Sequence, residues 1–493
     1  MSSYQPQPGS LSTEQLRAAG SRHLRLYIEA APGSGKTTVS SRRFGLHRFA
    51  PTTDHRAVTA VSFTRSATAE IRRRVLETWG PAALAWPHRV VTLDTVLYEL
   101  LTHILRADLL HWPGGHRELH VLDTWHAQLP VTYSRTKPVL TLTDAHIVAS
   151  HHREPRRVPT VGQEEFDEAV RQGICTHDDV RTVIQLALAT EEVRDSVLTF
   201  VRTTMRSLIV DEVFDANTLD LDLIDIAARA GIAITLVGDP WQALYAFRGA
   251  RPELIPELIG RHAFTQCDLT ASFRWRSAGQ EALARQLRSG ESTIVDPGLA
   301  TEVDVVLARD WKTLWDTDPH VLPMALKSAS GQFQEAACTL LLNEMTRRAF
   351  GTDAVFLHEA TTTLGIADDH ALNELRPELQ NVLDLLAGGT EIDNARICLN
   401  KTIAAATGLT APRKHRTHLE RLEKLRARLR VPQGKLVPGL TCHQAKGREW
   451  DTVGVRLTEV DGAQLLAGLR ADHEHHRAIY VALTRARART VAL

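Results

Sequence analysis

The stretch APGSGKTT, residues 31–38, constrains the fold more than any other part of the sequence. It follows LRLYIEA, which is typical of a strand, and it precedes a helix that we expect to begin near Lys36. Glycine lets backbone N–H groups approach phosphate oxygens, Lys36 supplies a mobile cation, and the Thr37 hydroxyl suits a magnesium ion. The order strand, loop, helix therefore predicts a nucleotide-binding P-loop in an α/β fold.

Short apolar runs rich in β-branched residues alternate with helical patterns near both ends of the chain. This alternation is typical of parallel sheets covered by helices. The further expected strands are AVTAVSF, RVVTL, SLIVDE, AITLVGD, KLVPGLTC and TVGVRL. The alternation stops twice, at about 106–204, where HWPGGH and REPRRVP are rich in turn residues, and at about 345–430. Because 493 residues exceed one ordinary core, we predict two α/β cores, each interrupted by an insertion, the first with a helical later half.

Composition limits the classes of function. The formal net charge is zero, so any binding of nucleic acid must come from local basic patches. The N-terminus lacks the pattern of a signal peptide, and no stretch approaches a membrane span, so we expect a cytoplasmic protein. Scattered cysteines without a CxxC pair argue against zinc and disulfides. They are Cys175, Cys267, Cys338, Cys398 and Cys442.

Two acidic residues follow the expected strand SLIVDE and suit the P-loop. Asp211 is placed to reach the metal, and Glu212 to orient and deprotonate an attacking water. An acidic pair after a strand is weak on its own, since such residues often cap helices, but behind a P-loop it predicts an ATPase or a GTPase.

The segment TLVGDPWQALYAFRGA, residues 235–250, suggests what the hydrolysis serves. Gln242 can sense a γ-phosphate, while Tyr245 and Phe247 can stack on bases of any identity. The alternative is that both aromatic residues belong to the core.

These segments, taken in order, resemble the motifs of superfamily 1A DNA helicases, the UvrD/Rep/PcrA group. The matching segments are LSTEQLRAA (Q motif), APGSGKT (I), AVSFTRSATAEI (Ia), VVTLDTVLYELL (Ib), LIVDEVFDAN (II), the segment 235–250 (III), LTASFRWRS (IV), LTCHQAKGREWDTV (V) and HRAIYVALTRARA (VI). The resemblance runs nearly from end to end.

The resemblance implies a fold of two RecA-like parallel-sheet P-loop domains, each with an inserted, mainly helical subdomain. The implied boundaries are 1–105 and 205–272 for core 1A, 106–204 for its insertion 1B, 273–344 and 431–493 for core 2A, and 345–430 for a reduced insertion 2B.

The resemblance also implies ATP and Mg²⁺ as cofactors. The residues that would bind ATP are Gln15, Gly33, Ser34, Gly35, Lys36, Thr37, Thr38, Phe273, Gly447 and Glu449. Gln15 would read the adenine, Phe273 would pack on it, and Glu449 would reach the ribose. Thr37 and Asp211 would hold the metal. The catalytic set would be Lys36, Glu212, Gln242, Arg274 and Arg485, with both arginines acting from the second core on the transferred phosphoryl group.

The implied partner is single-stranded and tailed duplex DNA. The residues that would contact the strand are Phe63, Thr64, Arg65, Tyr245, Phe247, Arg248 and His443. The function implied is an ATP-dependent 3′–5′ DNA helicase or translocase, in DNA repair or antiviral defence. No acceptor or base-specificity motif supports a kinase or a GTPase.

The chain departs from the family at several positions. Phe214 replaces the motif II glutamine, Thr38 replaces the arginine after the P-loop threonine, and Ser66 replaces the motif Ia lysine, next to Arg65; motif Ib lacks its TFH. We expect hydrolysis to survive and its coupling to DNA to weaken. The alternative function is therefore a DNA-sensing ATPase subunit that regulates a partner without unwinding.

The basic stretch APRKHRTHLERLEKLRARLRVPQGK, residues 411–435, has two interpretations: a solvated helix face or a contact with DNA phosphates. Its leucines 419, 422, 425 and 429 predict a core-facing stripe. Compact helicases with shrunken accessory subdomains also resemble the helicase component of Gabija-type antiviral modules. That resemblance implies a separate nuclease subunit as a partner, and no nuclease motif of this chain stands out.

Overall fold

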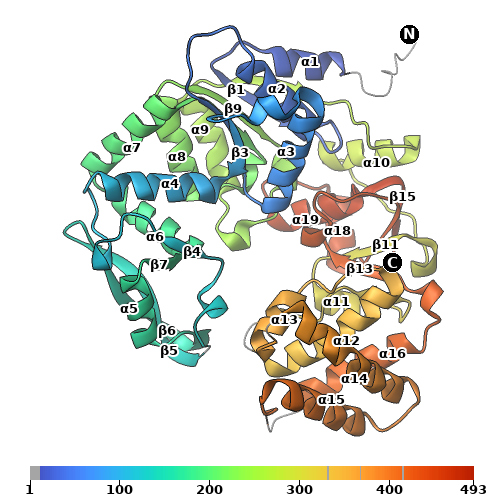
Figure 1. Ribbon diagram of the computed structural model, residues 1–493. Coiled ribbons are helices and arrows are strands. Elements are labelled where there is room, and N and C mark those ends of the chain that lie inside the picture. Colours follow the sequence, from blue (N-terminus) through green and yellow to red (C-terminus); the bar gives the residue numbers. More distant parts are fainter. Residues whose placement is uncertain (1–10, 131, 330–331, 367, 413–415) are drawn as a thin grey trace. The chain divides into compact units, whose positions relative to one another are not determined.

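The computed structural model describes residues 11–130, 132–329, 332–366, 368–412 and 416–493 (Figure 1). The chain divides into two units, Met1–Arg274 and Trp275–Leu493. Each unit contains one large parallel sheet with helices, which confirms the α/β fold class. The division falls two residues later than expected, so Phe273 and Arg274 lie with the first unit instead of opening the second.

The first unit is built on a six-stranded sheet of order β10-β1-β9-β8-β2-β3, in which every pair is parallel. All six residues of β2 are buried, as expected of a central strand covered on both faces. The strands are β1 (Arg25–Ala30), β2 (Ala57–Ser62), β3 (Arg89–Thr92), β8 (Met205–Asp211), β9 (Ala233–Gly238) and β10 (Thr265–Leu269).

Helices of the first unit connect these strands. They are α1 (Thr13–Gly20), α2 (Lys36–Arg48), α3 (Arg65–Trp79), α4 (Leu93–Arg106), α8 (Thr218–Arg229) and α9 (Ile255–Arg261). Buried Arg43 of α2 braces the sheet against α1: its guanidinium donates to the Thr235 hydroxyl of β9 and to the Ser21 carbonyl, 2.7 Å away, just after α1. These two hydrogen bonds hold α2, the helix that follows the P-loop, against β9 and against the segment just after α1.

The segment between α4 and β8 differs from expectation. Its later part is helical, with α5 (Gln163–Arg171), α6 (His177–Ala187) and α7 (Glu191–Thr204), but its first half is not mainly turns. There β5 (Thr132–Thr143) and β6 (His146–Thr160) form a long antiparallel hairpin, and β4 (His120–Leu122) pairs with β7 (Ile174–Thr176). The interpretation of REPRRVP as turn-rich was wrong because a solvent-facing strand tolerates proline and charge that a buried strand does not.

The second unit is built on a five-stranded parallel sheet of order β12-β13-β11-β14-β15. Its strands are β11 (Val305–Ala308), β12 (Val321–Pro323), β13 (Val437–Thr441), β14 (Trp450–Val455) and β15 (Ala486–Ala492). The accompanying helices are α10 (Ala278–Ser289), α11 (Trp311–Trp315), α17 (Cys442–Ala445), α18 (Glu459–Ala467) and α19 (Glu474–Leu483).

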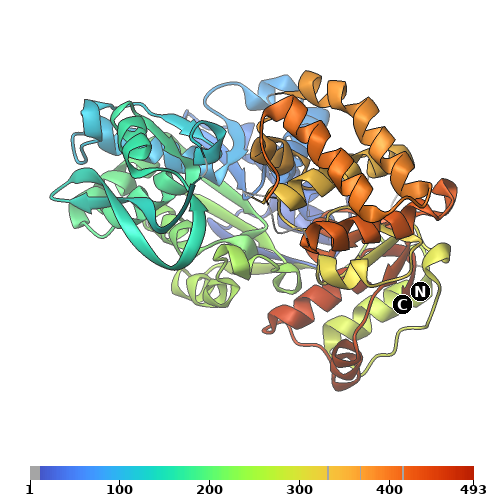
Figure 2. The same cartoon turned by 90° about the horizontal axis from the view of Figure 1, so that it is seen from below.

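A group of helices is inserted between β12 and β13 (Figures 1 and 2, in orange). It consists of α12 (Phe333–Phe350), α13 (Leu357–Leu364), α14 (Asp369–Ala387), α15 (Ile392–Thr407) and α16 (Arg416–Leu429). Leu422 and Leu425 are fully buried in its core and Leu429 packs against it, as the leucine stripe predicts. The group begins with α12, earlier than the expected boundary at residue 345.

Three basic residues of α16 have partners elsewhere in the second unit. Arg421 donates to Glu335 at 2.9 Å, Lys424 to Asp316 at 3.0 Å, and Arg428 to the Trp315 and Val321 carbonyls. These side chains are structural, so neither interpretation of the stretch 411–435 describes them. Residues 413–415 of that stretch lie outside the described residues. Within the described ranges, no helix is both long and apolar enough to cross a membrane.

Candidate nucleotide and DNA site

The P-loop lies between the end of β1 and the start of α2. Gly35 caps α2 with φ +84° and no side-chain hydrogen bond, and Gly33 has φ +73°. A Cβ atom at Gly33 would collide with the Arg274 side chain, and one at Gly35 with the Gln15 amide. Both positions therefore require glycine, and the first N–H groups of α2 are left to bind an anion.

The acidic pair ends β8, two strands away from the P-loop strand. Asp211 is buried, and burial followed by the charge of Glu212 raises the pKa of its carboxyl. Glu212 has the left-handed φ of 59°, which is rare and strained for a non-glycine residue, and its Oε1 lies 3.6 Å from Nζ of Lys36. The predicted lysine and catalytic carboxylate thus meet in one place.

Two buried polar atoms at this place have no hydrogen-bond partner among the described residues: Oδ1 of Asp211 and Oγ of Ser34. Thr37 lies one residue into α2. A carboxylate oxygen and a hydroxyl beside bound phosphates are oxygen ligands of the kind that Mg²⁺ takes. The residues present therefore fit the implied metal.

Gln242 belongs to the same sheet edge. It follows β9, which lies between β1 and β8, so the P-loop, Gln242 and the acidic pair come from three neighbouring strand ends. Its side-chain amide donates to Oδ2 of Asp239 at 2.7 Å, and both residues are buried. Asp239, which fixes the amide, was missed by sequence reasoning, although its position directly after a strand could have signalled it.

Gln15 is tied to the P-loop. It completes a capping box with Ser12 at the start of α1, and its Nε2 donates to the Ser34 carbonyl at 2.8 Å. Thr38, which stands where the family has an arginine, receives a hydrogen bond from Nη1 of Arg74 at 2.5 Å. Arg74 of α3 therefore brings a guanidinium to that position, and the run of arginines in IRRRV was the signal for it.

The segment after β10 closes over the P-loop within the first unit. The Ser272 hydroxyl donates to the Pro32 carbonyl at 2.7 Å, and the Phe273 N–H donates to the Gly33 carbonyl at 3.0 Å. Phe273 is half exposed, whereas Arg274 is buried. Arg274 was expected to act from the second core. The structure places it in the first unit beside Gly33.

Aromatic side chains follow Gln242 on a short loop. The rings of Tyr245 and Phe247 lie 6.0 Å apart, and the Arg248 guanidinium lies 5.1 Å and 5.5 Å from their centroids. Phe247 is 63% exposed, so the alternative that places it in the core is wrong. The arrangement is an exposed aromatic platform with an attached cation, as base stacking needs.

The motif Ia residues have local structural partners. Phe63 packs partly against the core, and the Thr64 hydroxyl accepts a hydrogen bond from Ala67 N–H at the start of α3. Arg65 forms an exposed ion pair with Asp123, a residue that sequence reasoning missed. Their proposed contacts with DNA remain predictions.

Four predicted residues lie in the second unit. His443 lies in α17, and exposed Gly447 and Glu449 follow in the loop to β14. Arg485, which lies between α19 and β15, is buried, and its carbonyl accepts from Trp450 N–H at 3.3 Å next to that loop. Motifs V and VI are therefore joined within this unit.

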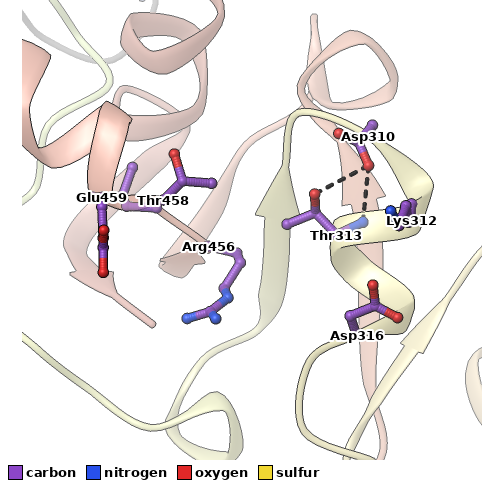
Figure 3. Close-up of a pocket in the computed structure, with 8 residues that line it drawn as sticks. Asp310, Lys312, Thr313, Asp316, Arg456, Thr458 and Glu459 are labelled. Carbon is purple, nitrogen blue, oxygen red and sulfur yellow. Dashed lines mark hydrogen bonds between the residues drawn. The ribbon is translucent and has the colours of Figure 1, made fainter.

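An open pocket of about 570 Å³ lies elsewhere in the second unit (Figure 3). It is lined by Asp310 and its neighbours after β11 and by residues 456–459 after β14. Asp310 accepts from the N–H and the hydroxyl of Thr313 and so caps α11. None of the predicted site residues lines this pocket, and its charges are mixed, so it has no part in the site.

A family model, the UvrD/REP helicase N-terminal domain, matches residues 11–127 and 150–262. The matched residues are therefore similar to the UvrD and Rep helicases. It is 24% identical to the ATP-dependent DNA helicase UvrD1 of Mycobacterium tuberculosis over 268 residues, 49% of this chain and 34% of that protein. DNA helicase II of Escherichia coli is 24% identical over 51% of this chain and 36% of its own length.

The ATP-dependent DNA helicase Rep of Escherichia coli is 26% identical over 46% of this chain and 35% of its own length. The matched region therefore spans about a third of these curated relatives. Among solved structures, unliganded Pif1 from Bacteroides sp. aligns over 61% of this chain and 54% of its own, with 13% identity and a TM-score of 0.29.

Proposed function

We propose that this chain is an ATP-driven DNA motor that moves 3′ to 5′ along single-stranded DNA and separates tailed duplexes. The observation that carries the proposal is one edge of the first sheet. Three neighbouring strand ends supply the Lys36 loop, the acidic pair and Gln242, and the loop after Gln242 exposes the Tyr245–Phe247 platform. Nucleotide chemistry and a base-stacking surface thus share one short segment.

The residues of this edge have distinct roles in hydrolysis. The open N-terminus of α2 and Lys36 bind the β- and γ-phosphates, and Glu212 orients the attacking water and accepts its proton. Bound Mg²⁺ supplies further neutralisation of phosphate charge, and Thr37 and Asp211 would hold it. Gln242, fixed by Asp239, contacts the γ-phosphate and transmits its presence to the aromatic loop.

The second unit completes the reaction in this proposal. Arg485 stabilises charge on the transferred phosphoryl group together with Arg274 of the first unit, Glu449 binds the ribose, and Gly447 lies beside the phosphates. Binding of ATP draws the units together, and hydrolysis lets them part. His443 adds the second unit's contact with the strand, so that each cycle moves the DNA.

Direction of movement and biological setting rest on the family resemblance. The 3′–5′ polarity is the usual one of the UvrD/Rep group, and single-stranded DNA is the substrate that the exposed aromatic loop suits. DNA repair and antiviral defence both supply such DNA.

A second candidate function is a DNA-sensing ATPase subunit that regulates a separate nuclease without unwinding. Phe214 favours it. This residue replaces the motif II glutamine, is 6% exposed, and packs edge-on against Tyr27 with centroids 6.3 Å apart. A buried phenyl ring has no hydrogen-bonding group with which to link the nucleotide to the strand.

Two assays on the purified chain test the proposal. ATP turnover is measured with and without a thymine-only single strand, and strand displacement is measured on duplexes carrying a 3′ or a 5′ tail. The motor predicts stimulated turnover and displacement with the 3′ tail alone. Stimulated turnover without any displacement supports the regulatory subunit, and turnover that ignores DNA contradicts both functions.

A further inference from the structure

The β5–β6 hairpin is an unusual surface of the first unit. Among the residues that the structure describes, its strands of 12 and 15 residues pair only with each other as a two-stranded sheet, apart from one bridge between His111 and His146. Figure 1 shows the hairpin beyond α5, at the end of the unit that is remote from the six-stranded sheet. The family model leaves out residues 128–149, which include all of β5 and the turn.

The hairpin concentrates positive charge in a chain whose formal net charge is zero. Against the two carboxylates Asp144 and Glu154, it carries five cations, all exposed: Arg135, Lys137, Arg153, Arg156 and Arg157. His151 and His152 lie among them and add charge when protonated.

A bulge gathers these cations into one place. Ser134 pairs with Val158 and Thr136 with Arg153, so Arg135 alone faces the four residues 154–157. Such bulges interrupt pairing and turn side chains outward. At about 3.3 Å per residue, the five cations lie within roughly 15 Å of ribbon.

These cations lack the partners that arginines elsewhere in the unit have. Within the described part of the chain, none of the five forms an ion pair. In contrast, Arg106 pairs with Glu118, Arg117 with Asp108 and Arg171 with Glu168 in the same inserted segment. Like charges that are held close together repel one another and destabilise the folded protein, and a bound polyanion would neutralise them.

One face of the hairpin is fixed to the protein. Leu140 and Ile147 are buried in the core of the first unit, and Leu142 and Ala149 pack partly against it. Side chains alternate along a strand, so Lys137, Thr141 and His152 lie on the opposite, solvent-facing side. Arg153 lies on the same side as Ile147 and Ala149, but like the other four cations it is exposed, so the anchored ribbon presents all five to solvent.

We infer that this ribbon, residues 132–160, is a docking surface for the phosphate backbone of duplex DNA. The inference rests on the proposed function only in taking DNA as the substrate. A two-stranded ribbon fits the major groove, and about 15 Å of B-DNA carries roughly nine phosphate charges. Beyond Tyr133 at its start, the ribbon has no Phe, Tyr or Trp ring with which to stack unpaired bases, so paired DNA suits it better than a single strand.

Binding of a labelled blunt duplex and of a thymine-only single strand, without nucleotide and across a salt series, tests this inference. The test variant combines Arg153→Gln, Arg156→Gln and Arg157→Gln in the full chain. The matched control combines Arg106→Gln, Arg117→Gln and Arg171→Gln, which removes equal charge from ion-paired positions of the same segment. Thermal melting of each variant confirms that it is folded.

The test variant should bind the duplex on the order of a hundredfold more weakly at low salt. The slope of log K against the logarithm of the salt concentration should become shallower by about 2.7, which is about 0.9 for each lost phosphate contact. Single-strand binding and the control variant should change little. An unchanged duplex slope, an equal loss in the control, or an equal loss for the single strand would each overturn the inference. Because no ATP is present, these outcomes are separate from failure of the motor.

Discussion

Replacing Phe247 by alanine isolates the DNA platform from the ATP site. The ring is 63% exposed and lies beside Tyr245 and Arg248 on a short loop, so its removal should leave folding nearly unchanged. Stacking of one base on an aromatic side chain contributes about 1–3 kcal/mol. The concentration of single strand that gives half-maximal stimulation of ATP turnover should therefore rise about 5- to 150-fold.

The assay is ATP turnover measured against the concentration of a thymine-only strand. Basal turnover should be unchanged because Lys36, Glu212 and Gln242 keep their contacts. The quantity that changes is the half-maximal strand concentration, which separates binding of DNA from chemistry.

Phe49 provides a matched control from the same unit. It is 46% exposed, its ring lies 5.8 Å from that of Trp79, and the Arg48 guanidinium lies 5.1 Å from its centroid. This is the same aromatic pair with a cation, but at the end of α2 and outside the expected strand path. If Phe247→Ala leaves the half-maximal concentration unchanged, or if Phe49→Ala raises it equally, the platform does not bind the strand.

Two further predictions concern chemistry and stability. Glu212→Gln should lower ATP turnover by about 10²- to 10⁴-fold, because the general base is lost. Equilibrium binding of a fluorescent ATP analogue should persist, because the P-loop is unchanged. Turnover equal to that of the wild type would remove Glu212 from the catalytic set. Glu335→Ala should lower the free energy of unfolding of the second unit by about 3–5 kcal/mol in chemical denaturation, since it strands the Arg421 charge that Glu335 now pairs at 2.9 Å. Adding Arg421→Met should restore most of that loss, and no restoration would mean that the pair is not its cause.

Most strands that the sequence predicted, the edge strand β3 excepted, share one physical property. AVTAVS and SLIVD are apolar and β-branched because both faces of a central parallel strand are buried. The edge strands β10, TQCDL, and β15, ARARTVA, were not predicted, since an edge needs far less apolar surface. The central strand β11, VVLA, was also missed, although all four of its residues are buried. The β5–β6 hairpin was missed for a related reason: its pairing is a property of two strands together, and its local composition indicates turns.

In the candidate site, too, some features could be predicted from the sequence and others could not. Residue types at fixed spacing predicted the P-loop, the acidic pair and the aromatic loop. Hydrogen bonds between distant segments were out of reach: Gln15 bonds Ser34 across 19 positions, Arg74 bonds Thr38 across 36, and Arg65 pairs with Asp123 across 58. The local sequence pattern predicts which chemical groups the site contains. The contacts between distant segments depend on how the helices pack in the folded protein, which no local pattern reveals.

Phe214 shows how the site can remain coupled without the family's glutamine. Its ring packs against Tyr27 of β1, whose strand leads into the P-loop, and it also occupies the space beside Gly238, the last residue of β9. A Cβ at Gly238 would lie 2.8 Å from the Phe214 ring, so the glycine is what admits it. Because β9 leads directly to Gln242 and then to the aromatic loop, one phenyl ring touches the strand before the nucleotide and the strand before the DNA platform. We propose that this close packing transmits displacement between the two strands, in place of the hydrogen bond that a glutamine would make. If the chain is a motor, we therefore expect the link between ATP and DNA to be steric and to depend on the size of residue 214 more than on its polarity.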